Sequence, residues 1–268
     1  MTDYQVAIPS RGRPDALTRL TLPWLAAGDV DPDRVTVFVH TDDPDVRAYA
    51  DLATDHGLRL HVHDAPGILG QRATIAAHYP AGTPVAVADD DITALRRATT
   101  VGDLVDVTDV HGWLTRAFEE TVGRDLWGWG VAAVPNPFYL HPGRVTDGLR
   151  FCIGTLHGFI ARPGHPVHDL TVPVKEDYEW SLRSWWWDGG IVRFGDTAVV
   201  ADHYRLPGGC VDTRTPDTSA AAATRLLDDW PGLVRRNTRR KGPHTEILLA
   251  TKARTLGHDR HTPPPGRG

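Results

Sequence analysis

Short apolar runs alternate with longer amphipathic stretches through the first third of the chain. Strand-like runs, β-branched or alternating, lie at residues 5–8, 34–41, 58–65 and 83–88. Between them, helical spacing of apolar residues occupies residues 14–28, 43–57 and 68–80. This alternation predicts an α/β fold with a mostly parallel central sheet and helices on both faces. The polar segments that follow three of the strands, "PSRGR", "HTDDP" and "ADDD", should converge on one crevice, because ligands collect beyond the carboxyl ends of such strands.

The second half of the chain has a different pattern. Residues 127–140 are rich in aromatics and predict one or two strands, and residues 149–164 predict a hairpin or a strand pair with glycine breaks. A helix is expected from Glu176 to the glycine pair at 189–190, followed by a strand within 191–205. One further helix is expected within residues 217–236.

The composition limits the class of protein. A chain of 268 residues that is 41% hydrophobic can form one large domain or two modest ones. Two cysteines, Cys152 and Cys210, argue against a disulfide scaffold or a zinc cluster and fit a reducing compartment. The first ten residues lack the features of a signal peptide, and no apolar run is long enough to span a membrane. We therefore expect a cytoplasmic protein with no membrane contact and no obligate protein partner.

Charge is distributed unevenly along the chain. The net charge of −5 divides into +6 for residues 225–268 and −11 for the rest. The segment "RRNTRRK" places five cations within seven residues, as a surface that follows phosphates would.

Three consecutive aspartates, Asp89, Asp90 and Asp91, follow the fourth predicted strand. A single aspartate here would be a helix cap or a turn residue. Three adjacent carboxylates repel one another, and a divalent metal with oxygen ligands is the natural cation to offset them. Asp89 and Asp91 also fall on the same side of an extended chain. The motif therefore predicts a metal site.

The order of these motifs resembles glycosyltransferases of the GT-A fold. The opening "VAIPSRGR", the "ADDD" after the fourth strand, "KED" at 175–177 followed by "YEWSLRSWW", and the late "ADHYR" occur in the family's order over roughly residues 4–210. The resemblance implies that Mn²⁺ or Mg²⁺ grips the diphosphate of a nucleotide-sugar, with a UDP-sugar favoured. It makes Asp91 the best metal ligand and His203 a further candidate. Asp89 is also a candidate ligand, although the resemblance favours its contact with the ribose or with a metal-bound water.

The same resemblance assigns a donor site and a catalytic base. Expected nucleotide-sugar contacts are Pro9, Ser10, Arg11, Arg13, Asp42, Asp43, Arg72, Asp89 and Asp90. Plain alternatives are that the aspartates are caps and that Arg72 is a solvated helix residue. Asp177 is the expected general base and Glu176 its rival. Alternatively, both are helix N-terminal acids stabilised by the helix dipole.

Within the GT-A enzymes, the chain resembles the TET-associated glycosyltransferases. These enzymes occur in phages and bacteria and are relatives of the base J DNA glucosyltransferase. The segments that carry this likeness are "IPSRGR", "VPNPFYL", "KEDYEWSLR" and the "HYRLPGG" to "RRKG" end. It implies a hydroxymethylated pyrimidine in DNA as the acceptor. Candidate acceptor contacts are His157, Tyr139, Trp185, Arg235, Arg236, Arg239, Arg240 and Lys241.

Alternatives to the DNA acceptor stay open. The cations could hold the donor diphosphate or form a solvated helix end. The protein could also glycosylate a small molecule or a polysaccharide, or bind nucleotide or DNA without catalysis. For the domain organisation, we expect a GT-A domain over residues 1–210, divided into a nucleotide-sugar half (1–95) and an acceptor half (96–210). A basic extension (211–268) would pack on the same domain.

Overall fold

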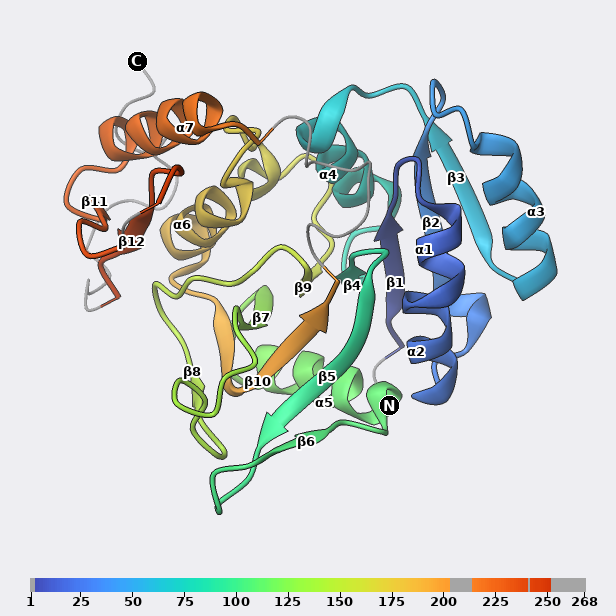
Figure 1. The fold of residues 1–268 in the computed structure, drawn as a ribbon, viewed down its shortest axis with the longest axis horizontal. Coiled ribbons are helices and arrows are strands. Elements are labelled where there is room, and N and C mark those ends of the chain that lie inside the picture. The colour runs from blue at the N-terminus through green and yellow to red at the C-terminus, as the bar shows by residue number, and fades with distance from the viewer. Residues whose placement is uncertain (1–2, 203–213, 241, 252–268) are drawn as a thin grey trace.

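One ten-stranded sheet runs through the molecule, with helices on both faces (Figure 1). The computed structural model describes residues 3–202, 214–240 and 242–251. The strand order is β3-β2-β1-β4-β9-β7-β10-β5-β6, and β8 pairs with β10. Strands β3, β2, β1 and β4 are parallel, whereas β9 is antiparallel to both of its neighbours. This mixed α/β sheet confirms the expected fold class.

The strands of this sheet are β1 (Gln5–Pro9), β2 (Val35–His40), β3 (Arg59–His63), β4 (Pro84–Ala88), β5 (Ile92–Ala98), β6 (Leu104–Asp106), β7 (Gly128–Ala132), β8 (Val145–Thr146), β9 (Leu156–Ile160) and β10 (Val192–Ala201). The helices are α1 (Pro14–Arg19), α2 (Thr21–Ala27), α3 (Val46–His56), α4 (Gly67–His78), α5 (Val110–Gly123), α6 (Glu176–Asp188) and α7 (Pro216–Asp229), with short 3₁₀ turns at Pro32–Arg34 and Pro166–His168. A separate hairpin joins β11 (Val234–Arg236) to β12 (Ile247–Leu249).

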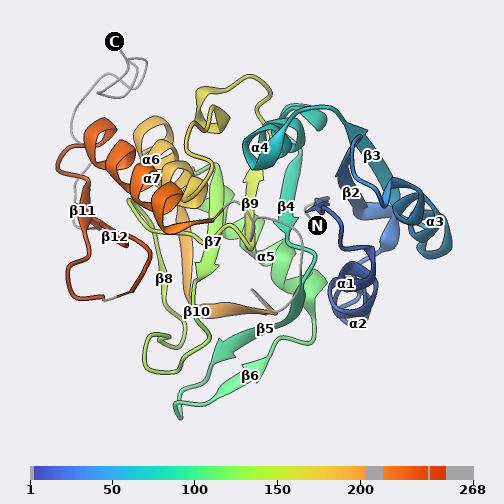
Figure 2. The same cartoon turned by 45° about the horizontal axis from the view of Figure 1, so that its top comes forward.

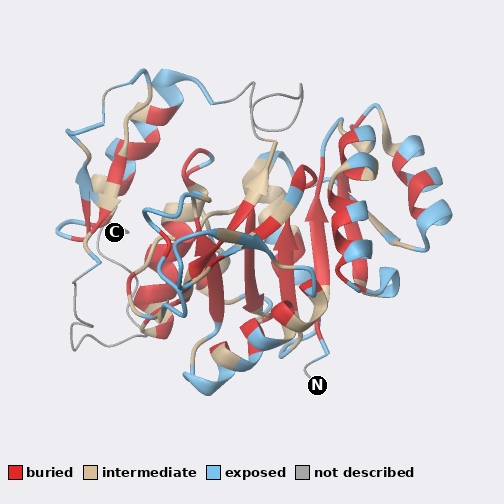
Figure 3. Ribbon diagram, turned by 60° about the horizontal axis from the view of Figure 1, so that its bottom comes forward, coloured by how far each residue is buried: buried red, intermediate tan, exposed pale blue. Residues whose placement is uncertain are grey.

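The two faces of the sheet are covered by different helices. On one face, Val6 and Ile8 of β1 pack in a core cluster with α1, α2, α3 and α5. On the other, Ala7 packs in a second cluster with Ile75 of α4 and Trp180 of α6. Alternate residues of β1 thus enter opposite cores, as a strand buried on both faces requires. The central strands are correspondingly buried along their length (Figure 3).

The C-terminal segment packs against α6. Ala223 and Leu226 of α7 share a core cluster with Leu182 and Trp185 of α6, to which β11 and β12 also contribute. Figure 2 shows α7 beside α6, with the β11–β12 hairpin at the same end of the molecule. Trp185 is only 1% exposed within this cluster. It is a core residue and cannot be the surface contact for an acceptor that the sequence suggested.

Residues 14–28 form two helices instead of the single expected one. Pro23 has no N–H, and its ring would clash with the carbonyl four residues earlier in an uninterrupted helix. The chain breaks at Leu20, and Pro23 lies in the first turn of α2, where its missing donor is not needed. The break also frees the Thr21 hydroxyl, which donates to the Asp89 carbonyl (2.9 Å) and accepts from the Ile92 N–H (2.9 Å).

The strands in the central part of the chain differ from the expectation at residues 149–164, where there are fewer, and at residues 92–98, where there is an additional one. Residues 149–164 form only β9 where a hairpin or strand pair was expected, whereas the single strand β7 within residues 127–140 agrees with the expected one or two. Strand β5 directly follows the three aspartates and was not expected. Its sequence "ITALRRA" mixes burial and charge because it lies near the edge of the sheet, between β10 and β6.

The close contact between β7 and Cys152 leaves no room for a side chain at Gly130. A Cβ at this position would lie 2.3 Å from the Cys152 Cβ. We expect Gly130→Ala to lower the free energy of unfolding by about 1–3 kcal/mol, the usual cost of overpacking a core. Urea denaturation followed by circular dichroism measures the change. Gly123→Ala is the matched control, because nothing lies within 4 Å of a Cβ there and the position ends helix α5. Equal stability of wild type and Gly130→Ala would contradict the packing at this contact.

Candidate active site

The ends of β1, β2 and β4 meet through a chain of buried hydrogen bonds. The Arg13 N–H donates to the Tyr49 hydroxyl (2.8 Å), which contacts Ser10 Oγ (2.6 Å). Ser10 Oγ donates its own proton to Asp90 Oδ2 at 2.5 Å. Asp43 is also buried and accepts from the Gly12 N–H at 2.7 Å. The expected convergence of these three polar segments is therefore present.

The residues expected to contact the donor differ in exposure. Pro9, Ser10, Asp43 and Asp90 are buried, whereas Arg11 and Asp42 are exposed. The buried carboxylates hold the loops together: Asp43 anchors the "SRGR" turn, and Asp90 receives Ser10. Burial raises the pKa of Asp90 to about 7, against the lowering effects of Ser10 and Arg13.

Two arginines lie beside the three consecutive aspartates. Arg13 Nη1 is 3.4 Å from Asp90 Oδ1 and 3.6 Å from Asp91 Oδ2. Arg72 Nη2, on α4, is 3.7 Å from Asp89 Oδ1. The protein's own guanidinium groups therefore offset part of the repulsion that, from the sequence, called for an external cation.

Helix α6 presents Glu176 and Asp177 in its first turn. Both side chains are half-buried, and burial raises the pKa of each carboxyl group, with Asp177 adding to the rise at Glu176. The residue before them, Lys175, has a left-handed backbone (φ 74°), which is uncommon for a residue with a side chain. Lys175 is 4% exposed, and its Nζ lies 5.7 Å from the centre of the Tyr178 ring. Such strain at the start of α6 is typical of functional sites.

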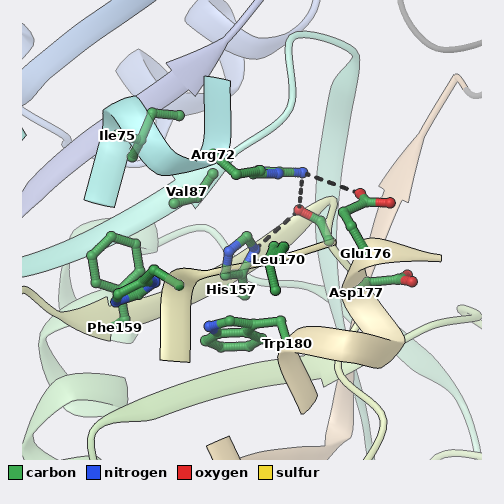
Figure 4. Close-up of a pocket in the computed structure, with 11 residues that line it drawn as sticks. Arg72, Ile75, Val87, His157, Phe159, Leu170, Glu176, Asp177 and Trp180 are labelled. Carbon is green, nitrogen blue, oxygen red and sulfur yellow. Dashed lines mark hydrogen bonds and ion pairs between the residues drawn. The ribbon is translucent and has the colours of Figure 1, made fainter. Parts of the chain in front are cut away.

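Arg72 connects the aspartates of β4 with the acid pair of α6. Its Nη2 lies 4.0 Å from Glu176 Oε1, in addition to its contact with Asp89, and donates to the Gly154 carbonyl at 3.2 Å (Figure 4). His157 Nδ1 binds the same carbonyl at 3.0 Å, which places this buried imidazole behind Arg72. One guanidinium thus fixes the spacing between the two acidic groups of the site.

The remaining acceptor candidates lie in two regions. Tyr139 is 64% exposed and forms an edge-to-face pair with Phe138 on the connection after β7. Arg235, Arg236, Arg239 and Arg240 are all exposed in and after β11. Arg240 Nη1 lies 3.9 Å from Glu246 Oε1. Lys241 lies outside the described residues.

The hairpin that carries these arginines adjoins the acidic end of α6. Tyr178 donates from its hydroxyl to the Ile247 carbonyl of β12 (3.3 Å), and Phe151 stacks on its ring at 4.2 Å. The Lys175 ammonium, in turn, lies in the field of Glu246 and Arg240. The basic segment therefore belongs to the surroundings of Asp177.

A metal would find its clearest protein ligands at Asp89 and Asp91. Carboxylate oxygens suit Mn²⁺ and Mg²⁺, and the Asp202 N–H donates to the Asp91 carbonyl at 3.0 Å, which brings the end of β10 beside this residue. Within the described ranges, no group of three or more His, Cys, Asp or Glu side chains is arranged to hold a metal. His203 lies outside those ranges. The fit is therefore to two carboxylates, whose remaining partners would come from the donor phosphates.

Two residues near the site were missed from the sequence: Lys175 and His168. Lys175 could have been found only from its backbone conformation. His168 is brought to the site by the Pro166–His168 turn, which no local pattern places beside α4.

Comparison with solved structures gives the fold a class. S. aureus TarS 1-349 in complex with UDP-GlcNAc is similar with a TM-score of 0.55 and 14% identity over 85% of this chain and 67% of that chain. The same protein in complex with UDP gives a TM-score of 0.50 and 12% identity over 85% and 66%. No known family model matches this sequence, and no curated protein matches it. The chain has the GT-A fold, and it spans about two thirds of the TarS 1-349 chains. No helix in the described ranges is both long and apolar enough to cross a membrane.

The position of Arg72 predicts its effect on Glu176. Its positive charge opposes the rise in the pKa of Glu176 that burial causes. We expect Arg72→Met to raise this pKa further, because the charged form loses its nearest cation. Carboxyl ¹³C NMR across a pH titration measures the shift, with Arg19→Met, at an exposed position on α1, as the control. An unchanged or lowered Glu176 pKa in Arg72→Met would contradict this role.

Proposed function

We propose that the protein is a metal-dependent glycosyltransferase that moves a sugar from a UDP-sugar to a hydroxyl group. The observation that carries the proposal is the Arg72 bridge, which holds the aspartates of β4 and the acid pair of α6 around one space in a GT-A fold. A nucleotide-sugar transferase needs both parts: a place for the diphosphate leaving group and a carboxylate base beside the acceptor.

Residues 1–95 would bind the donor. Arg13 and Arg72 supply guanidinium groups, which pair well with diphosphate oxygens, and the β1 and β2 loops offer Arg11 and Asp42 at the surface. TarS, the similar structure, binds UDP and UDP-GlcNAc, which favours a uridine donor. Asp91 and Asp89 would hold Mn²⁺ or Mg²⁺, completed by His203. Such a metal would neutralise charge on the leaving diphosphate.

Asp177 is the general base in this proposal. Glu176 faces Arg72 and so belongs to the donor side, whereas the neighbours of Asp177 include Lys175 and Arg214 on the acceptor side. Asp177 would take the proton of the acceptor hydroxyl as its oxygen attacks the anomeric carbon, and the bond to the nucleoside diphosphate would break on the opposite face. This in-line displacement inverts the anomeric centre.

The acceptor we favour is a hydroxymethylated pyrimidine in DNA, the substrate implied by the likeness to TET-associated enzymes. Exposed arginines adjoin the Asp177 end of α6, and the exposed Phe138–Tyr139 pair offers a surface on which an extruded base could stack. Residues 96–210 would hold the acceptor, and the extension at 211–268 would follow its phosphates. A polysaccharide or small-molecule acceptor is the second candidate, favoured by the contact of Arg240 with Glu246, which offsets one of these cations.

A transfer assay with single substitutions tests the chemistry. With a UDP-sugar, Mn²⁺ and hydroxymethylated DNA, we expect Asp177→Asn to lower kcat by roughly 100-fold or more while donor affinity stays near wild type. Because the base acts as a carboxylate and burial raises its pKa, wild-type kcat should fall as pH decreases through a value above the usual aspartate range. Mass spectrometry of the DNA measures transfer.

Three comparisons make that assay decisive. Loss of activity in Glu176→Gln with full activity in Asp177→Asn would move the base to Glu176. Full transfer after EDTA treatment would rule out the metal. Transfer to a free sugar or polysaccharide, with none to DNA, would favour the second candidate acceptor.

The basic segment predicts a specific salt dependence. Replacing Arg235, Arg236, Arg239 and Arg240 with Ala should flatten the slope of log affinity for DNA against log salt by roughly three units, if each contacts one phosphate. Fluorescence anisotropy with labelled DNA measures the slope. UDP affinity should hardly change.

A matched control uses four exposed arginines elsewhere: Arg19, Arg47, Arg97 and Arg116. Replacing them with Ala changes the net charge by the same amount. It should leave the slope of log DNA affinity against log salt mostly unchanged. If instead the first variant loses UDP binding and keeps its slope, the arginines hold the donor diphosphate, and the DNA acceptor loses its support.

A further inference from the structure

A small, mostly apolar cavity lies directly behind the acid pair, between α4 and α6. Its walls are the side chains of Ile75, Val87, Phe159, Leu170 and Trp180, and its polar rim holds Arg72, Gly154, His157, His168, Glu176 and Asp177 (Figure 4). The mechanism proposed above uses the two carboxylates and the outer face of Arg72. It leaves the apolar interior without a role.

Two buried polar atoms on this cavity have no hydrogen-bond partner among the described residues. One is Nη1 of Arg72, a donor, and the other is Nε2 of His168. Leaving a buried donor or acceptor unsatisfied is unfavourable, because the group has lost its hydrogen bonds to water. These atoms are therefore available to a group that brings both an acceptor and a donor.

The two histidines are neutral and can accept a hydrogen bond. Burial lowers the pKa of His168 to about 3 and that of His157 well below its usual value. The His157 Nδ1 faces the Gly154 carbonyl, which can only accept, so the proton is on Nδ1 and Nε2 carries a lone pair. The polar rim thus combines a guanidinium donor with the acceptor nitrogen of His157 and with a second neutral imidazole, that of His168.

The cavity is large enough for a small substituent of a sugar but too small for a sugar ring. The volume open to the centre of a water molecule is about 30 Å³. A single water molecule needs about 10–15 Å³ on the same scale. This is room for a group of a few heavy atoms. An N-acyl group has the matching chemistry: its carbonyl accepts from Arg72, its N–H donates to an imidazole, and its methyl group meets the apolar wall.

The location of the cavity indicates which carbon of the sugar bears this group. Glu176 and Asp177 stand at its rim and, in the proposed reaction, act next to the anomeric carbon. A substituent that enters the cavity from a sugar held at these carboxylates is attached to the adjacent carbon, C2. An unsubstituted C2 hydroxyl would leave the apolar walls uncovered.

We infer that the donor is a UDP-2-acylamino-hexose whose acyl group is bound in the cavity between α4 and α6. The inference rests on the proposed nucleotide-sugar function and names the class of donor. Arg72, His157 and His168 recognise the amide, and Leu170 and Trp180 cover the methyl group.

Donor binding by isothermal titration calorimetry tests the inference without any acceptor. With Mn²⁺ present, we expect UDP-GlcNAc to bind at least about tenfold more tightly than UDP-glucose, as filling an apolar pocket with a small group allows. Leu170→Phe, which fills the cavity, should bring the two affinities close together and leave UDP affinity unchanged. Leu170→Ala, which enlarges it, should strengthen binding of UDP-N-butanoyl-glucosamine relative to UDP-GlcNAc. Leu104→Phe, at a half-buried leucine of β6, is the control that should change none of these ratios.

The outcomes separate the two proposals. Equal affinity of the wild type for UDP-GlcNAc and UDP-glucose, with UDP itself bound, would overturn the acyl pocket and leave the transferase function intact. An unchanged preference in both Leu170 variants, with their folding checked by urea denaturation, would also overturn it. A wild type that binds neither UDP nor any UDP-sugar would overturn the donor assignment and the pocket together.

Discussion

The burial of carboxylates at the end of β4 is the constraint on which the rest of the site depends. Removing a charged group from water costs several kcal/mol unless opposite charge and hydrogen bonds accompany it. Here Arg13 lies beside Asp90 and Asp91, Arg72 lies beside Asp89, and Ser10 donates to Asp90. Ser10 and Arg13 come from the turn after β1, and Arg72 comes from α4. The charge at one strand end therefore determines how the β1 loop and α4 pack against β4.

Arg72 extends this constraint from the end of β4 to α6. A single guanidinium contacts Asp89 and Glu176 and binds the Gly154 carbonyl. The acid pair thus keeps its distance from β4 through side-chain contacts. On the other side of α6, the link from Tyr178 to Ile247 joins the acid pair to the basic hairpin. The arrangement places the carboxylates that follow β4 on one side of the start of α6 and the basic hairpin on the other.

Much of the fold of residues 1–95 could be predicted from the sequence, because β1, β2, β4 and helices α3 and α4 follow simple local patterns. The end of the first helix could not be predicted. It is set by Pro23 and by a hydrogen bond from Thr21 to the Asp89 carbonyl, which lies in a turn remote in sequence. Arg13 and Arg72 were expected to meet a ligand, which stays a prediction, but their pairing with the carboxylates of Asp89, Asp90 and Asp91 across the fold has no signal in the sequence. Trp185 lies in the core, as its place in a run of three tryptophans (185–187) favours, and its assignment as an acceptor contact is wrong. His168 has no sequence signal, since only the tertiary fold brings its turn to α4. The roles of Asp177, Asp91 and the basic segment remain predictions.

The place of β9 in the sheet has a consequence for synthesis of the chain on the ribosome. β9 lies between β4 and β7, and it is the element that closes the edge of the parallel half. Until residue 160 has emerged, β4 presents an open row of backbone N–H and C=O groups formed by "PVAVA", the kind of edge that recruits strands from other chains. The polar residues that terminate β4 stand at the end of this edge. The nascent protein would therefore be most prone to association with other chains after β4 has been made and before β9 has paired.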